Sequence, residues 1–310
     1  MFVIKVAPTS AIDGTGAAED MKRFLFALLH ATRVLSLVSW FNRGRVTILC
    51  YHSVLSTDEP ATHDPHKQHI PLGLFLDHLS YLQNNYRVIS LNEFVKARRD
   101  HRRLPDYSVV LTFDDGFEDF FTVAAGHLAQ RNLPATIFVI TDRADGSLPP
   151  NGESFLSWQE VQKLAASGTQ VGSHTCSHPA LLNLSFDEVR RELADSQTAI
   201  LNHMTEADVP LSYPYGQTSA EISKLARSLG YSCAITGALG PNGSDADLFA
   251  LSRTVIASND DVATFAARVS GLTWWAGKLR HSIEPKHRRE LEPHFSPCYG
   301  SVPAETYEGS

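Results

Sequence analysis

The sequence predicts an α/β fold in which parallel strands form a sheet or barrel, and three observations support this prediction. From residue 45 onward, short β-branched or apolar runs alternate with segments of helical periodicity, as they do in βα units. The strand-like runs are continuously apolar, which is typical of strands buried on both faces of a sheet. Acidic and histidine residues follow several of these runs, where the loops of such folds carry chemistry.

Eight strands are expected, each bounded by turn or helix signals. They comprise residues 46–51, 87–90, 108–113, 135–140, 170–173, 211–213, 232–235 and 251–256. The chain has 310 residues, of which 43% are hydrophobic and 20% charged, so it can bury one large core.

Helix starts are expected where a serine is followed three residues later by glutamate, because the two side chains can satisfy free backbone amides in a capping box. The matching pairs are Ser90 with Glu93, Ser157 with Glu160, and Ser185 with Glu188. Gly168 and Gly230 stand where the preceding helices would need a left-handed residue before a new strand begins.

The amino-terminal segment, residues 1–44, is expected to be a flexible leader followed by an amphipathic helix. Its first twenty residues are rich in small side chains, and an apolar stretch follows up to Trp40. This helix would pack on the core or lie at a membrane interface through residues 21–40. A signal or anchor sequence is the alternative, because Lys22 and Arg23 precede the apolar residues.

The remainder divides into two segments. Residues 45–270 contain no Pro/Gly/Ser-rich linker, so we treat them as one domain. Residues 271–310 begin with an aromatic and basic stretch and end in a polar tail. A packed helix or a surface for a membrane or partner would suit that stretch.

Charge and cysteine content limit the function and the cellular compartment. The net charge of −7 argues against nucleic acid as a main partner. The four cysteines are widely spaced, without a C-x-x-C pair, and we predict free thiols; they are Cys50, Cys176, Cys233 and Cys298. A cytoplasmic or membrane-peripheral location is expected, with export as the alternative, and the oligomeric state is left open.

Two motifs at strand ends carry the functional signal. Asp114 and Asp115 follow the strand 108–113, and His174 with His178 follows the strand 170–173. One carboxylate and two imidazoles suit Zn²⁺ or another first-row divalent ion and leave positions open for water and substrate. The second carboxylate could accept the proton of that water. The sequence therefore predicts a metal-dependent hydrolase.

These motifs, residues 112–116 and 174–178, resemble the first two motifs of the polysaccharide deacetylase family, the NodB-homology domain of carbohydrate esterase family 4. The resemblance spans roughly residues 45–256. It implies a distorted (β/α)7-type barrel of the NodB-homology kind, which removes N-acetyl groups from an amino-sugar polysaccharide or glycolipid.

The same resemblance implies the roles of four residues. Asp115, His174 and His178 would hold the metal, and Asp114 would be the general base. Zinc is the expected ion, with iron, cobalt, manganese or nickel as alternatives. An N-acetylated glycan is the expected partner.

The chain departs from the family in its later motifs. The R-x-P-Y motif reads Ser-Tyr-Pro-Tyr at residues 212–215, and no clear late L-x-H motif supplies the usual acid histidine. Three segments instead resemble the subgroup that deacetylates biofilm poly-N-acetylglucosamine: Tyr51-His52, Tyr213-Pro214-Tyr215-Gly216 and Leu251-Ser252-Arg253. This resemblance implies that His52 is the general acid and that Arg253 replaces the missing arginine.

Aromatic side chains near the site are candidates for holding the sugar. Tyr213 and Tyr215 are expected in this role, and the resemblance also gives the backbone amide of Tyr215 a place in the oxyanion site. Because two motifs are altered, a catalytically weak glycan-binding relative is an alternative function. An O-acetyl esterase is another.

Overall fold

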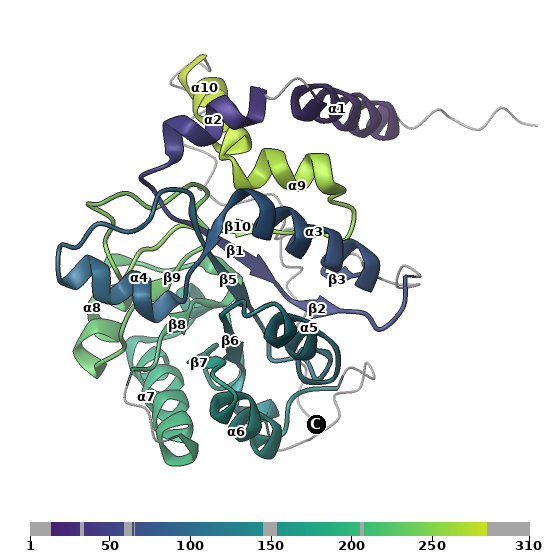
Figure 1. The fold of residues 1–310 in the computed structure, drawn as a ribbon. Helices are drawn as coiled ribbons and strands as arrows, with labels where there is room; N and C mark the ends of the chain where they lie inside the picture. Colours follow the sequence, from purple (N-terminus) through teal and green to yellow (C-terminus); the bar gives the residue numbers. More distant parts are fainter. Residues whose placement is uncertain are drawn as a thin grey trace, which may run out of the picture.

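The structure is a computed structural model that describes residues 14–31, 34–58, 64, 66–144, 154–204 and 208–283. Figure 1 shows a curled central sheet surrounded by helices, with α1, α2, α9 and α10 gathered at one end of the molecule. Every strand pair in the central sheet is parallel. The predicted α/β fold with a parallel, barrel-like sheet is therefore confirmed.

The eight-stranded sheet has the order β10-β1-β5-β6-β7-β8-β9, and β4 pairs with β5 beside this path. The strands are β1 (Thr47–Tyr51), β4 (Arg87–Val88), β5 (Ser108–Phe113), β6 (Ala135–Val139), β7 (Gln170–Ser173), β8 (Leu211–Ser212), β9 (Ala234–Ile235) and β10 (Thr254–Val255). A parallel bridge from Ile235 to Leu251 links β9 to the segment before β10. The sheet is thereby curled toward closure.

All the predicted strands are present, although most are shorter than expected. Only 108–113 and 170–173 keep their predicted bounds. Sequence analysis missed a separate two-stranded parallel sheet formed by β2 (Ser53–Val54) and β3 (His69–Ile70). Its strands are two residues long, too short for a period-2 pattern to be recognised.

Helices cover the outside of the sheet (Figure 1). They are α3 (Leu72–Asn85), α4 (Leu91–Arg99), α5 (Ala125–Gln130), α6 (Trp158–Ala166), α7 (Phe186–His203), α8 (Ala220–Leu229), α9 (Val262–Val269) and α10 (Leu272–Ile283), with a π-helix at Phe120–Ala124 and 3-10 turns at Thr141–Arg143, Leu181–Asn183 and Pro214–Gly216. Complete capping boxes start α6 and α7, whereas Ser90 of the third pair only accepts the Glu93 amide. Gly168 and Gly230 both have positive φ, as predicted.

The described part of the amino-terminal segment contains two helices where one was expected, and residues 1–13 of the expected leader lie outside the described residues. Helix α1 (Gly14–Ala31) begins within the first twenty residues, where alanines and a glutamate favour helix formation. Helix α2 (Val34–Asn42) follows. In the described part of the chain, no single helix is long and apolar enough to cross a membrane. Residues 21–30 and 34–42, bent by 79°, meet that test only as a pair.

Three of the four cysteines lie in the described residues, and all three are free thiols, as predicted. They are Cys50, Cys176 and Cys233. Cys298 and the expected polar tail lie outside the described residues. Strands β1 and β5 are buried along their whole lengths, so the loops that follow them start from a rigid core.

Candidate active site

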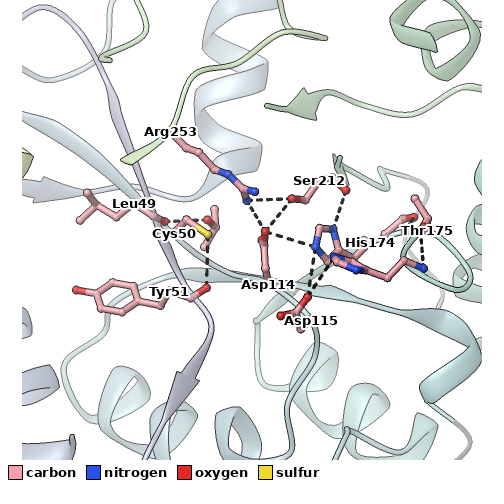
Figure 2. A network of polar contacts seen from close by, with 12 residues as sticks. Leu49, Cys50, Tyr51, Asp114, Asp115, His174, Thr175, Ser212 and Arg253 are labelled. Atoms are coloured by element: carbon pink, nitrogen blue, oxygen red, sulfur yellow. Dashed lines mark hydrogen bonds and ion pairs between the residues drawn. The ribbon is translucent and has the colours of Figure 1, made fainter. Parts of the chain in front are cut away.

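The predicted site residues come together at the carboxyl ends of three strands and at the start of a fourth. His52 follows β1, Asp114 and Asp115 follow β5, His174 follows β7, and Arg253 immediately precedes β10. Figure 2 shows the side chains of Asp114, Asp115, His174 and Arg253 directed toward one another. Parallel pairing aligns the carboxyl ends of β1, β5 and, through β6, β7, and the pairing of β1 with β10 places Arg253 at the start of the strand beside β1.

Asp115, His174 and His178 form a compact cluster of metal-ligand atoms. The Oδ1 atom of Asp115 lies 3.4 Å from His174 Nε2 and 3.6 Å from His178 Nε2. The three candidate ligand atoms are all within 4.8 Å of one another. One carboxylate and two imidazoles around a common point suit a tetrahedral or five-coordinate divalent ion with open positions.

Neighbouring groups prepare the two imidazoles to bind a metal. The Nδ1–H of His174 donates to the carbonyl of Ser212 at 2.8 Å, which leaves the lone pair of Nε2 directed at the cluster. Burial, followed by the nearby His174, lowers the pKa of His178 to about 4. Both effects favour the neutral imidazole, which is the form that binds metal.

The backbone at this cluster is strained in a way that aims the side chains. Asp115 and His178 have φ values of 70° and 64°, in the left-handed region that non-glycine residues seldom occupy. Tyr215, at φ 56°, shares this conformation, and its ring centroid lies 4.8 Å from that of His178. Such backbone strain persists where the surrounding structure enforces it, typically at functional sites.

Asp114 is wholly buried and is held by Arg253 and Ser212. The Nη1 atom of Arg253 donates to Asp114 Oδ2, and the Ser212 hydroxyl donates to the same oxygen at 3.1 Å. Burial alone would raise the pKa of Asp114. Arg253, with smaller effects from His174 and His52, outweighs burial and holds the pKa of Asp114 well below its ordinary value. Asp114 is therefore ionised at neutral pH.

His52 is 2% exposed and lies beside Asp114. One ring nitrogen of His52, one Asp114 oxygen and the Cys50 thiol all lie within 4.8 Å of one another. Burial lowers the pKa of His52, while Asp115 and Asp114 oppose that effect. Its Nδ1 atom has no hydrogen-bond partner among the described residues. A cation between these three groups is disfavoured because the Arg253 guanidinium already contacts Asp114.

Tyr213 does not reach the sugar site, so its predicted role is wrong. Its side chain is wholly buried, and its hydroxyl lies 3.3 Å from both the Ser223 hydroxyl and the Phe249 carbonyl. As the last residue before the 3-10 turn Pro214–Gly216, it points into the core, where its hydroxyl finds partners. Tyr215, within that turn, is partly exposed and remains near the cluster.

Sequence reasoning missed Glu192, which fastens the loop that carries both histidines. Its carboxylate accepts the backbone amides of Cys176 and Ser177 at 2.9 and 3.0 Å, and the Ser177 hydroxyl at 2.7 Å. Glu192 lies in the middle of α7, where the sequence shows only an ordinary polar helix face. Ser212 was also missed as a ligand-orienting residue, although it stands at the position of the family's motif arginine.

The fold and site define a class of protein: an α/β barrel with one carboxylate and two imidazoles, a donor set that would suit a divalent ion, beside a buried, ionised aspartate. Comparisons with known proteins relate part of the chain to one family. Residues 101–234 match the family model described as "Polysaccharide deacetylase". This part of the chain is therefore similar to the polysaccharide deacetylase family.

Named relatives and solved structures resemble a larger share of the chain. The Escherichia coli (strain K12) poly-beta-1,6-N-acetyl-D-glucosamine N-deacetylase is 26% identical over 269 residues, covering 74% of this chain but only 39% of the relative's length. Among solved structures, Streptococcus pyogenes deacetylase PplD in complex with acetate has a TM-score of 0.64 at 24% identity, covering 73% of this chain and 99% of PplD. IcaB from Ammonifex degensii has a TM-score of 0.63 at 24% identity, covering 73% and 97%. The structural likeness supports the fold.

Proposed function

We propose that this protein is a metal-dependent hydrolase that removes N-acetyl groups from an amino-sugar polysaccharide or glycolipid. The observation that carries the proposal is the gathering of Asp115, His174 and His178 beside the Asp114–Arg253 pair. The match of residues 101–234 to the family model and the name of the Escherichia coli relative support the choice of an N-acetylated glucosamine polymer.

The donor set of the cluster fits a divalent metal. Asp115 supplies a partly exposed carboxylate. The two histidines supply Nε2 atoms that lie 3.4 and 3.6 Å from its Oδ1 atom. Zinc suits these donors best, and iron, cobalt, manganese or nickel would also accept them. When bound, the metal would lower the pKa of a coordinated water and polarise the acetyl oxygen.

Asp114 is proposed as the general base. Its Oδ2 atom is engaged by Arg253 and Ser212, whereas its Oδ1 atom has no hydrogen-bond partner among the described residues. Oδ1 can therefore accept a proton from a water near the cluster. Arg253 keeps the carboxylate ionised and fixes its orientation, as expected for an arginine that replaces the missing arginine of the R-x-P-Y motif.

The leaving amine needs a proton, and His52 is the proposed donor. It follows β1 and belongs to a different cluster of side chains from the three candidate metal ligands. The backbone amide of Tyr215 is proposed to stabilise the oxyanion, because the left-handed turn brings this residue against His178. The Tyr215 ring is then available to contact the sugar.

Acetate release from oligomers of N-acetylglucosamine tests this proposal. We expect release by the zinc-loaded wild type, at least about 100-fold less by Asp114→Asn and by His52→Ala, and none with a chelator present. Comparing β-1,6-linked with β-1,4-linked oligomers identifies the linkage. O-acetylated sugars, supplied in parallel, identify an esterase. Tight glycan binding without acetate release would show instead a glycan-binding relative, and equal release by all three proteins would refute the proposed roles.

A further inference from the structure

Large apolar side chains are exposed on the three helices at one end of the molecule. The set comprises Met21, Phe24, Leu25 and Leu28 of α1, Val34, Leu37, Trp40 and Phe41 of α2, and Trp275 and Leu279 of α10. Phe24, Phe41 and Leu279 are 68%, 64% and 65% exposed. Elsewhere in the described residues, the exposed large hydrophobic side chains are Leu182, Phe186 and Leu201. We call the first set the apolar face.

The opposite sides of the same helices hold them to the domain. Phe26 of α1 and Leu35 of α2 are buried against Ala266 and Ala267 of α9. Helix α9 also contacts α10, so one short helix supports all three elements that carry the apolar face. In Figure 1 these helices lie beyond α9, away from α6, α7 and α8. Because each helix is anchored along one side, its other side faces outward.

The charge of this region is mainly positive. From residue 14 to residue 57 the chain has five Lys or Arg and two acidic residues, Glu19 and Asp20 of α1, and α9 and α10 add three more basic residues without an acidic one. The two aspartates just before α9 are occupied: Asp260 is buried and pairs with Arg268 at 2.7 Å, and Asp261 caps α9. The chain as a whole carries a net charge of −7, so the basic charge is concentrated here.

Apolar side chains with tryptophans, in a region where basic residues outnumber acidic ones, match the chemistry of an anionic lipid surface. Apolar groups enter the boundary between headgroups and acyl chains, tryptophan prefers that boundary, and Lys or Arg interacts with lipid phosphates. A protein partner of ordinary composition would not require an excess of basic residues. We propose that α1, α2 and α10 bind the surface of an anionic bilayer through the apolar face.

The anchoring of the helices favours lying on the bilayer over crossing it. A span would have to detach Phe26 and Leu35 from α9 and straighten the 79° bend between the two helices. Lying on the surface keeps both buried contacts and requires no rearrangement. The domain would then be held at the membrane as a peripheral protein.

Vesicle sedimentation with the purified full chain tests the proposal. We expect the wild type to sediment with vesicles of phosphatidylethanolamine and phosphatidylglycerol and to remain soluble with phosphatidylcholine alone. Combining Phe24→Ser, Leu37→Ser and Phe41→Ser should weaken binding at least about tenfold. The matched control combines Leu182→Ser, Phe186→Ser and Leu201→Ser, whose residues are similarly exposed near or on α7, and should bind like the wild type.

A second pair of variants tests the electrostatic part without removing apolar area. Lys22→Glu with Lys278→Glu should lower binding to the anionic vesicles roughly tenfold, whereas Arg191→Glu with Lys224→Glu, on α7 and α8, should not. All four variants should keep the wild-type thermal midpoint and acetate release. Equal sedimentation of the apolar-face and control variants would overturn the proposal. Equal binding of the wild type to anionic and to phosphatidylcholine vesicles would also overturn it. A third contrary result would be a wild-type dimer that binds no vesicles and dissociates when the apolar-face residues are substituted.

Discussion

The guanidinium of Arg253 donates to the carboxylate of Asp114, and both side chains are wholly buried although 139 residues separate them in the sequence. Ser212 completes the arrangement, because its hydroxyl contacts both partners at 3.0 and 3.1 Å. A buried ion pair of this kind is costly to break on one side, since the remaining charge has no compensation.

Replacing Arg253 with methionine should therefore destabilise the protein by about 3–5 kcal/mol, because Asp114 would be left buried and charged. The same substitution in an Asp114→Asn background should cost much less. Urea unfolding of the two single variants and the double variant measures the difference. If the loss of unfolding free energy in the double variant equals the sum of the losses in the two single variants, the two side chains are not coupled. The pairing of Arg253 with Asp114 in solution would then be wrong.

Metal removal should abolish activity, and substitution of either histidine ligand should lower metal affinity. We expect His174→Ala and His178→Ala each to bind zinc at least about 100-fold more weakly, since each removes one of three protein donors. Calorimetric zinc titration of the metal-free protein gives the affinities. Cys176→Ser is the control, because Cys176 lies between the histidines in sequence but outside the cluster. A comparable loss in that variant would contradict the ligand set.

Glu192 is expected to affect the metal site through the histidine loop. In Glu192→Ala the amides of Cys176 and Ser177 lose their acceptor, so zinc affinity should fall about 10–100-fold. Glu188→Ala, one turn earlier on α7, removes a capping interaction instead and should lower the thermal midpoint slightly without changing zinc affinity. Identical zinc affinities of the two variants would show that the loop does not need Glu192.

Asp119 should give the stability an unusual dependence on pH. Burial raises its pKa to about 6, even though the Ser53 hydroxyl donates to it. Between pH about 4 and about 6 the folded state holds a proton that the unfolded state has released, so this contribution to stability declines as pH rises. Relative to Asp119→Asn, the wild type should lose about 2–3 kcal/mol across that range. Urea unfolding at several pH values checks this, and parallel stability curves would refute it.

Gly216 lets two backbone segments approach beneath Tyr215. A Cβ on Gly216, which has φ 67°, would lie 2.3 Å from backbone atoms of Gly237. Gly168 also has positive φ, but a Cβ there meets nothing within 4 Å. Gly168→Ala should therefore cost about 1 kcal/mol for the backbone conformation alone. Gly216→Ala should cost at least ~2 kcal/mol more and reduce acetate release. Equal unfolding free energies for the two variants would contradict this account.

Regular features of the fold could be predicted from the chain because their causes are local. Strands 108–113 and 170–173 have the predicted bounds, since continuous apolar runs are bounded by turn residues. The capping boxes at Ser157 and Ser185 depend only on residues three apart. The break between α1 and α2 was missed, because an apolar stretch fits one helix as well as two. The packing of both helices on α9 decides between one helix and two.

The candidate site was predictable where a motif holds its residues close in sequence. Asp114 with Asp115, and His174 with His178, follow predicted strands, and parallel pairing brings those strand ends together. Glu192 carries no such signal, because its contacts with Cys176 and Ser177 depend on where α7 packs. Tyr213 was misjudged for the same reason: its exposure depends on which way the turn at Pro214 faces.

By itself the sequence determined the α/β class, the strand ends that carry chemistry, and the two motifs of the deacetylase family. These follow from hydrophobic periodicity and short spacings, which act within a few residues. The tertiary structure alone decided that Arg253 pairs with Asp114, that Ser212 orients His174, and that Tyr213 is a core residue. Each depends on distances between segments far apart in the chain, and the packing of the strands and helices sets those distances.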